Sequence, residues 1–255
     1  MSLSTHYLDA FNANRRIDLM TPAHKTSVTG SAMVLPPKMP TQMLSGYTLA
    51  SQTDFTKVDQ STFLNSWWRW QGTPGGDPNA LWDPSMVALD AGGLHLLTSE
   101  PGSVFSGNDK WVSGGVGSKH SQTFGHYHFC IRIPDAQGID FVSLLWPVGD
   151  KWPPEVDVVE SMDGSTNCFV HYSSSNRQDV YKYTGINWNH WQQVQVWWTS
   201  QSLRINVGGA QRVYTTNNVP QVPMRLDFQA QTYDPSKASA CAFDVAWVRQ
   251  FAKTF

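Results

Sequence analysis

The chain has 255 residues and a net charge of -2. This length suits one large domain with its own core, and all-β sandwiches of this size often form a single domain. The near-neutral charge, with no run of Lys or Arg, argues against nucleic acid or anionic membrane as a partner. No stretch approaches the roughly 20 consecutive apolar residues of a transmembrane helix.

The N-terminal part of the chain differs in composition from the rest. Residues 1–45 mix Asn, Arg, Thr, Ser and several prolines without a sustained period, so we interpret them as an extension and 46–255 as the main domain. The chain starts without the basic and then apolar pattern that is typical of a secretory signal.

Cysteine is scarce in the chain, whereas tryptophan is abundant. Cys130, Cys168 and Cys241 are too few and too widely spaced for a disulfide framework or a zinc site, and a single disulfide is the alternative to free thiols. The 12 tryptophans form several short clusters. Flat amphipathic rings suit a groove that binds sugars, although burial in the core is the alternative for each of them.

From residue 46 onward, short alternating segments lie between Gly, Pro, Asn and Asp turns, which predicts strands. Residues 126–133 ("HYHFCIRI") and 224–231 ("MRLDFQAQ") alternate apolar side chains with polar or small ones. No long segment has helical spacing. We therefore predict an all-β fold in which two antiparallel sheets pack face to face, with polar side chains of one sheet lining a groove.

The stretch "WPPEVDVVES", residues 152–161, places three carboxylates among valines. In a strand, Glu155 and Asp157 share one face, but strict alternation would turn Glu160 to the other. One extra residue at Val158 or Val159, a β-bulge, would return Glu160 to the acidic face.

Two carboxyl groups that flank a scissile bond are what glycoside hydrolysis needs, one as acid and one as nucleophile or base. The close like charges would raise one pKa and keep a proton on the acid. Two other interpretations stay open from spacing alone: a solvated strand face, and a Ca²⁺ site built from the three carboxylates.

Residues 113–161 closely resemble glycoside hydrolase family 16, and the bulged E-x-D-x-x-E signature of that family is intact as Glu155, Asp157 and Glu160. Further likeness runs through residues 190–209 and the last strands, so it covers about 46–255 in the right order. The resemblance implies a lectin-like (concanavalin A-like) β-jelly roll with a substrate cleft on its concave sheet. It also implies retaining endo-hydrolysis of a β-linked polysaccharide, with Glu155 as nucleophile, Glu160 as general acid/base and Asp157 assisting, and no cofactor for catalysis.

The resemblance also indicates candidate substrate-binding residues. Trp146 and Trp152 flank the acidic signature and would stack on sugars, with core burial as the alternative. His171 and Gln229 lie where the family often places polar cleft residues, and a structural hydrogen-bonding role is the alternative for the histidine. Asn79 and Trp82 belong to an early loop that we expect in the cleft wall; the set is Trp146, Trp152, His171, Gln229, Asn79 and Trp82.

Two positions concern metal and charge. Asp244 resembles a family residue that helps to bind structural Ca²⁺, although it could equally be an ordinary polar strand residue. His128 and Cys130 stand where the family commonly has Glu and Arg, so a charge pair that we expect beside the cleft is missing.

The leading hypothesis is an endo-acting glycosidase that cuts a β-1,3-linked or mixed-linkage β-glucan, with a bacterial exopolysaccharide as the alternative substrate. A non-catalytic carbohydrate-binding jelly-roll module or adhesin is the alternative function, and a calcium-dependent structural role of the acidic strand is a third. We expect a monomer whose polysaccharide substrate lies outside the cell, and hence a secreted or outward-facing protein.

Overall fold

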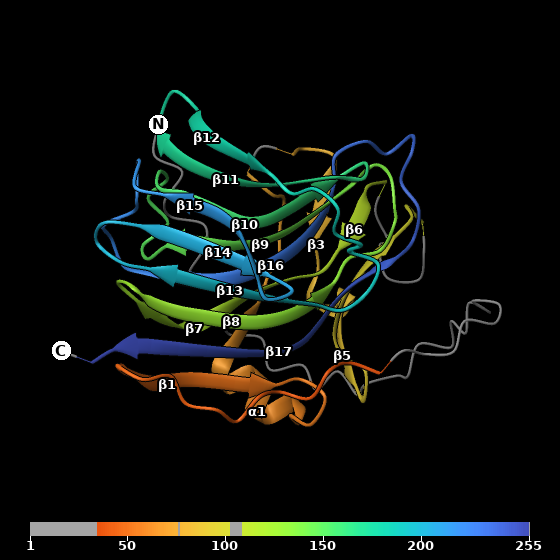
Figure 1. Ribbon diagram of the computed structural model, residues 1–255. Coiled ribbons are helices and arrows are strands. Elements are labelled where there is room, and N and C mark those ends of the chain that lie inside the picture. The colour runs from red at the N-terminus through yellow and green to blue at the C-terminus, as the bar shows by residue number, and fades with distance from the viewer. Residues whose placement is uncertain (1–34, 76, 103–108, 255) are drawn as a thin grey trace. The chain divides into compact units, whose positions relative to one another are not determined.

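Nearly all regular structure in the computed structural model is β-strand, and the strands form two sheets (Figure 1). The structure describes residues 35–75, 77–102 and 109–254, which belong to one compact unit, Leu35–Phe255. The predicted all-β fold of two packed antiparallel sheets is confirmed. The helices among the described residues are short: α1 (Gln60–Ser66), which Asp59 caps, and the 3-10 turn η1 (Pro84–Met86).

The larger sheet has ten strands, in the order β15-β14-β13-β8-β17-β5-β6-β3, with β1 also paired to β17 and β4 to β5. All its pairs are antiparallel except the short pair β3–β6. Its strands are β1 (Tyr47–Asp54), β3 (Ala80–Trp82), β4 (Val87–Asp90), β5 (Gly93–Ser99), β6 (Trp111–Ser113), β8 (Gly125–Arg132), β13 (Gln192–Trp198), β14 (Leu203–Val207), β15 (Ala210–Thr215) and β17 (Ala242–Lys253).

The smaller sheet has seven strands in the order β12-β11-β10-β9-β16-β7-β2, all antiparallel, and it contains the acidic stretch in β10. Its strands are β2 (Trp67–Arg69), β7 (Gly115–Gln122), β9 (Ile139–Pro147), β10 (Glu155–Met162), β11 (Ser165–Ser173), β12 (Arg177–Lys182) and β16 (Met224–Thr232).

The core lies between the two sheets. The apolar alternation of β8 and β16 points into it from opposite sides, and the rings of Phe129 and Phe228 meet edge to face with centroids 5.5 Å apart. Val156, Val158 and Val159 of β10 lie in the same core, each fully buried. Burial of one face of the smaller sheet therefore fixes which side chains its other face presents.

The polar positions of β8 do not face the cleft, so the expectation of a missing charge pair beside it is wrong. β8 belongs to the larger sheet, whereas β10 belongs to the smaller one, and His126 and His128 point to the outer face of the larger sheet. There His126 packs 4.4 Å from the ring of Trp197, and His128 packs 4.7 Å from Trp247. Alternation alone could not show which sheet the strand joins.

The outer face of the larger sheet is covered by residues that precede β1. The indole N–H of Trp247 donates to the carbonyl oxygen of Pro37 (2.9 Å), and the guanidinium of Arg249 donates to that of Gln42 (2.7 Å). Residues 35–45 thus pack onto the sheet in this structure, while the predicted boundary between an extension and a domain at 45/46 stays a prediction.

Two further expectations concern the cysteines and the membrane. All three cysteines are free thiols, so the alternative of a single disulfide is wrong. Among the residues that the structure describes, no helix has the length and apolar character needed to cross a membrane.

Candidate active site

A bulge in β10 brings the three carboxylates of the acidic stretch to one face. The ladders to β9 and to β11 both shift register after Asp157, and Val158 has no partner in either ladder. The predicted bulge is therefore confirmed. Glu155, Asp157 and Glu160 share the outward face of the smaller sheet, which we call the acidic face, while the valines between them enter the core.

A tyrosine hydroxyl holds the bulge. Val158 is the unpaired residue, and its carbonyl oxygen would be a buried acceptor without a ladder partner. The hydroxyl of Tyr183, which follows β12, donates to that oxygen at 2.7 Å, and the Tyr183 ring packs edge to face on Trp188. The register that turns Glu160 to the acidic face is thus fixed by a specific hydrogen bond.

Side chains on both sides of β10 bind the carboxylates. The indole N–H of Trp152 donates to Oε2 of Glu155 at 2.8 Å. His171 of β11 pairs with Glu155 in register, and its Nε2 lies 2.9 Å from Oδ2 of Asp157. The carboxyls of Glu155 and Asp157 also share a hydrogen bond. Glu155 and Asp157 are therefore held in a fixed arrangement before any substrate arrives.

Burial and mutual repulsion favour protonation of these carboxyls at neutral pH. Both effects raise the pKa of Glu155 to about 8 and that of Glu160 to about 7, and they raise the pKa of Asp157 well above its usual value. Because the groups interact, protons leave the set in steps that belong to the set as a whole. Around neutral pH the set therefore holds ionised and protonated carboxyls side by side, which acid–base chemistry requires.

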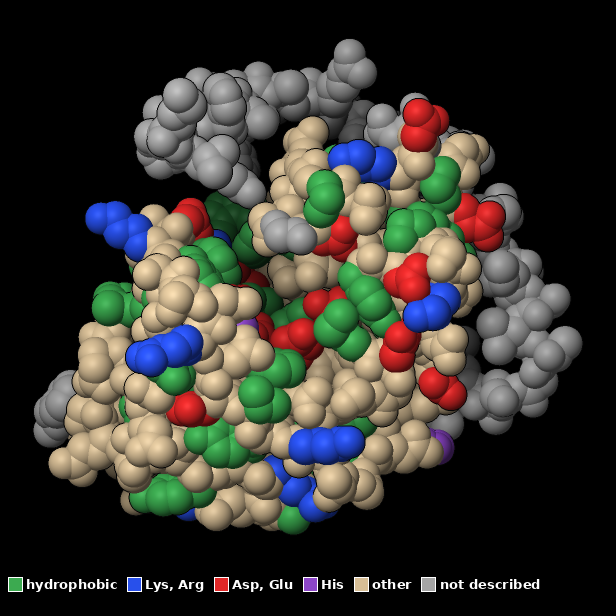
Figure 2. All heavy atoms as spheres, turned by 90° about the horizontal axis from the view of Figure 1, so that it is seen from above, with side chains coloured by type: hydrophobic (Ala, Val, Ile, Leu, Met, Phe, Trp, Pro, Cys, Tyr) green, Lys and Arg blue, Asp and Glu red, His purple; other side chains and the backbone are tan. Residues whose placement is uncertain are grey.

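The surface view shows where acidic groups gather. In Figure 2, Asp and Glu side chains collect in a hollow between hydrophobic side chains. Such a hollow gives a polymer both apolar surfaces for its ring faces and polar groups for its hydroxyls.

Four of the predicted substrate-binding residues lie near the carboxylates. Trp152 and His171 contact Glu155 and Asp157 directly, and their rings lie 5.9 Å apart. Trp146 of β9 is half-buried, and its indole N–H donates to Asp150 at 2.8 Å. Gln229 of β16 pairs with Val142, the β9 residue that pairs with Glu160, so all three side chains point to the acidic face. Their roles toward substrate stay predictions.

The two residues predicted for the cleft wall lie in different surroundings. Trp82 of β3 is buried, its indole N–H donates to the carbonyl of Ala230 at 3.0 Å, and its ring packs edge to face on Trp70. Asn79 precedes that strand, is exposed, and its backbone N–H donates to Asp77. The structure gives Trp82 a supporting position behind Trp70, and it shows no contact of Asn79 with the three carboxylates among the described residues.

Sequence reasoning missed two carboxyls of the acidic face. Asp140 of β9 is buried with its Oδ2 accepting from Gln231 (3.0 Å), and burial raises its pKa well above the usual value. Asp227 of β16 is fully buried beside Arg225, 3.1 Å away, and burial still raises its pKa to about 8. The alternation of 224–231 already placed Asp227 on the face of Gln229, so that signal could have found Asp227, but not Asp140.

An arginine and two tryptophans extend the acidic face toward β2. The guanidinium of Arg225 lies over the rings of Trp68 (5.6 Å) and Trp70 (5.7 Å), and it also bonds Asp150. Trp68 remains 38% exposed. A side chain at Gly115 would come within 3.3 Å of the Trp70 ring, so this glycine leaves room for the tryptophan above the sheet. In the sequence, the only indication of Trp68 and Trp70 as residues of this face was that they belong to a tryptophan cluster.

The acidic strand is a poor calcium site. In the described part of the chain, Glu155, Asp157 and His171 offer potential ligand atoms within 4.8 Å of one another. Ca²⁺ takes six to eight oxygen ligands, whereas here an imidazole and an indole N–H already bind two of the carboxylates. This geometry suits a proton-exchanging set better than a structural calcium ion.

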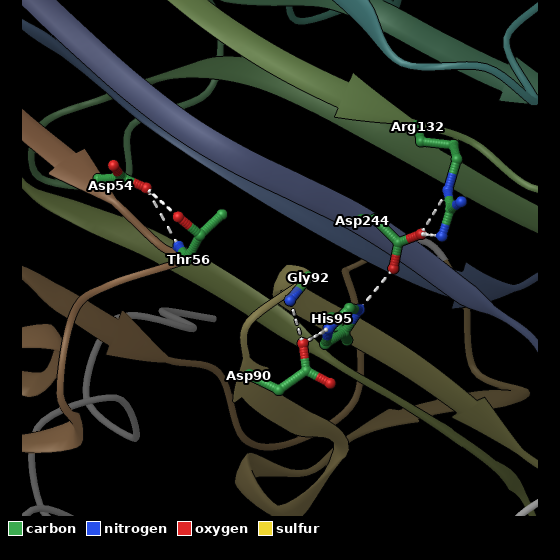
Figure 3. A network of polar contacts seen from close by, with 7 residues as sticks. All are labelled: Asp54, Thr56, Asp90, Gly92, His95, Arg132 and Asp244. Carbon is green, nitrogen blue, oxygen red and sulfur yellow. Dashed lines mark hydrogen bonds and ion pairs between the residues drawn. The ribbon is translucent and has the colours of Figure 1, made fainter. Parts of the chain in front are cut away.

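Asp244, the predicted calcium ligand, is bound by cationic side chains on the larger sheet (Figure 3). Oδ2 accepts from Nε and Nη2 of Arg132 (2.9 and 2.7 Å), and Oδ1 lies 2.6 Å from Nδ1 of His95. Nε2 of His95 in turn lies 2.8 Å from Asp90. Both oxygens of Asp244 are therefore occupied beside a fixed positive charge, which does not fit Ca²⁺, and the calcium prediction is not confirmed.

Comparisons with known proteins agree with the geometry. The family model described as "Glycosyl hydrolases family 16" matches residues 77–249. Over 115 residues the chain is 30% identical to "Endo-1,3-1,4-beta-glycanase ExsH" of Rhizobium meliloti (strain 1021), a match that covers 42% of this chain and 24% of that protein. The match thus spans about a quarter of the length of this relative.

Two solved structures illustrate the likeness of fold. The laminarinase catalytic domain of Thermotoga maritima matches with a TM-score of 0.68 at 14% identity, over 82% of this chain and 99% of that one. A family 16 endo-glucanase of Bacteroides ovatus matches with a TM-score of 0.66 at 18% identity, over 78% and 99%. The predicted jelly-roll sandwich is confirmed by these matches.

Proposed function

Because the chain belongs to glycosyl hydrolases family 16, we propose that it is a retaining, endo-acting glycosidase that cleaves a β-linked polysaccharide. The observation that carries this proposal is the bulge in β10, which places Glu155 and Glu160 on one face with Asp157 between them. A sugar-binding module has no need of this arrangement. A catalyst needs two carboxyls in different protonation states on one surface.

Glu155 is the nucleophile in this proposal. The reactive state is the one in which Glu155 is ionised and the proton lies on Glu160. The indole N–H of Trp152 stabilises that ionised form and partly offsets the burial and the charge of Asp157 that raise the pKa of Glu155. Its oxygen attacks the anomeric carbon while Glu160 gives its proton to the departing glycosidic oxygen. The ionised Glu160 then takes a proton from water, which attacks the same carbon and releases Glu155. Asp157 is hydrogen-bonded to both Glu155 and His171, and these two bonds keep the side chains of Glu155 and His171 in place.

The substrate we propose is a β-1,3-linked or mixed-linkage β-glucan. Among the described residues, the acidic face carries more carboxyls than cationic side chains, which are Arg225 and Lys182, and Arg225 is already paired with two aspartates. A polymer rich in sulfate or carboxylate would meet repulsion there, whereas a neutral glucan would not. The name of the Rhizobium meliloti relative, an endo-1,3-1,4-beta-glycanase, supports the same substrate class. Such polymers lie outside cells, so we propose that the protein acts there, as a monomer.

The test is a reducing-end assay on laminarin, lichenan, agarose, carrageenan and bacterial exopolysaccharides. We expect cleavage of a neutral β-glucan by the wild type, with internal cuts that shorten the polymer quickly. Glu155→Gln should fold normally and release nothing. If the wild type leaves every polymer intact but both proteins bind one of them, the proposal fails and the function is that of a binding module.

A further inference from the structure

We propose that Asp140 is a positioning residue that stands as a neutral carboxylic acid beside Glu160 and donates a hydrogen bond to it whenever Glu160 is ionised. The role of Glu160 as acid/base rests on the proposed function. The pairing of the two carboxyls rests on the fold alone.

The strand register places the two side chains on the same surface. In the ladder between β9 and β10, Glu160 pairs with Val142 and Met162 pairs with Asp140. Directly paired residues point to the same face, so Asp140 shares the acidic face with Glu160 and is its diagonal neighbour. Diagonal positions in an antiparallel pair are about 7–8 Å apart, which an Asp and a Glu side chain can span together.

The surroundings of Asp140 favour its neutral form. The residue is only 4% exposed, and the one hydrogen bond of its carboxyl group among the described residues comes from the side-chain amide of Gln231. Its second oxygen, Oδ1, is buried and has no hydrogen-bond partner in the part of the chain that the structure describes. An ionised carboxylate with one neutral donor would be costly here, whereas a protonated one keeps Oδ2 as acceptor and makes Oδ1–H a donor.

The charged and titratable groups around Asp140 act in the same direction. The neighbouring strand β10 contributes Glu155, Asp157 and Glu160, all of which disfavour a negative charge on Asp140. Gln231 of β16 is neutral, and Tyr233 just beyond it keeps its proton because its pKa is raised. Together with burial, these neighbours raise the pKa of Asp140 well above its usual value.

The pairing has a catalytic consequence. Once Glu160 has given its proton to the leaving group, its carboxylate remains in a buried acidic site. A donor at Oδ1 of Asp140 would stabilise that carboxylate without adding charge. Asp140 would then act like other buried carboxylic acids that stay protonated at neutral pH and can therefore donate a hydrogen bond. Asp140 would therefore act through Glu160 and need not touch the sugar.

The first test reads the protonation state of Asp140 directly and needs no activity. An infrared difference spectrum between wild type and Asp140→Asn at pH 7 shows which species the substitution removes. We expect the loss of a protonated carboxyl band. Loss of a carboxylate band instead would overturn the proposal, even if the protein proves to be an active glycosidase.

The second test measures the pairing through Glu160. The chain contains only three glutamates, Glu100, Glu155 and Glu160, so labelling with glutamate carrying ¹³C at the carboxyl gives three signals, which single Gln variants assign. Asp140→Asn keeps a donor in place and should leave the Glu160 titration within a few tenths of a pH unit. Asp140→Ala removes the donor, and the Glu160 midpoint should rise by about one pH unit.

A control separates this effect from a general change of charge. Asp179→Asn, on β12 at the edge of the same sheet, removes one acidic group and should leave the Glu160 midpoint unchanged. Equal Glu160 midpoints in wild type, Asp140→Asn and Asp140→Ala would overturn the pairing. A lower Glu160 midpoint in Asp140→Asn than in wild type would also overturn it, because it would show that the substitution had removed a negative charge. If Asp140→Ala does not fold, the infrared spectrum and the Glu160 midpoint in Asp140→Asn still test whether Asp140 is a neutral acid.

Discussion

The hydroxyl of Tyr183 donates a 2.7 Å hydrogen bond to the carbonyl oxygen of Val158, the residue that the bulge in β10 leaves unpaired. A bulge can relax if nothing binds the carbonyl that it frees, and a slip of one residue would turn a side chain to the other face of the sheet. This contact therefore connects a residue outside the acidic strand with the orientation of Glu160.

Tyr183→Phe removes that donor and keeps the ring. We expect a loss of about 1–3 kcal/mol in unfolding free energy, because a buried carbonyl becomes unsatisfied. We also expect a fall in kcat with little change in KM, because Glu160 loses its fixed position. Urea unfolding and steady-state kinetics measure the two effects. Tyr181→Phe, on β12, is the control for removing a tyrosine hydroxyl nearby, and a Tyr183→Phe enzyme with wild-type kcat would contradict the argument.

The indole of Trp152 should tune the nucleophile through its N–H. Trp152→Phe keeps an aromatic ring but loses the 2.8 Å hydrogen bond to Glu155. A hydrogen bond to a charged group contributes about 1.5–3 kcal/mol, so kcat/KM should fall about 10- to 100-fold. Trp146→Phe is the matched control, because its indole N–H donates to Asp150 instead. Kinetics on the same soluble glucan compare the two, and equal losses would show that stacking rather than hydrogen bonding matters.

The acidic strand itself could be predicted because its spacing is informative within one strand. Only a bulge puts Glu155, Asp157 and Glu160 on one face, and the flanking valines show which face is buried. Asp140 could not be placed in the same way. It stands in an apolar run, and its proximity to Glu160 depends on the register between β9 and β10, which is a property of two strands.

In the larger sheet, too, the sequence predicted the strands but not which strands lie next to each other. The alternation of 126–133 correctly predicted a strand with Tyr127 and Phe129 in the core. It could not show that the histidines of that strand lie on the outer face of the opposite sheet, because strand order is set by long-range pairing. The position of Asp244 on a strand was readable, whereas its partners Arg132 and His95 come from two other strands.

The network around Asp244 should make the outer face independent of calcium. Arg132 and His95 bind both oxygens of a carboxylate whose side chain is 5% exposed. We expect EDTA to leave Tm unchanged and added Ca²⁺ to do the same. Asp244→Asn should cost about 1–3 kcal/mol, since Arg132 is left without its anion but is partly solvated. Asp90→Asn, at the exposed end of the network, should cost less. A drop in Tm with EDTA that Ca²⁺ restores would contradict this account.

The carboxyls of the acidic face should cost the protein stability at neutral and alkaline pH. In an unfolded chain a Glu titrates near pH 4.3, whereas burial raises the pKa of Glu155 in the folded chain to about 8. Between these values the folded state holds a proton that the unfolded state has released, so its stability falls as pH rises. Above about pH 8 the folded state must carry the buried charge, and the full penalty applies.

Glu155→Gln removes this titration and should therefore stabilise the protein while abolishing activity. At pH 4 the two proteins should unfold at nearly the same temperature. At pH 8 the variant should be more stable by about 2–4 kcal/mol, which corresponds to about 5–10 °C in Tm. Thermal unfolding across this pH range measures the difference. Glu100→Gln is the matched control, because Glu100 is exposed, and its Tm should follow the wild type at every pH. A Glu155→Gln variant with no gain at pH 8 would mean that Glu155 is not held in a site that favours its protonated form.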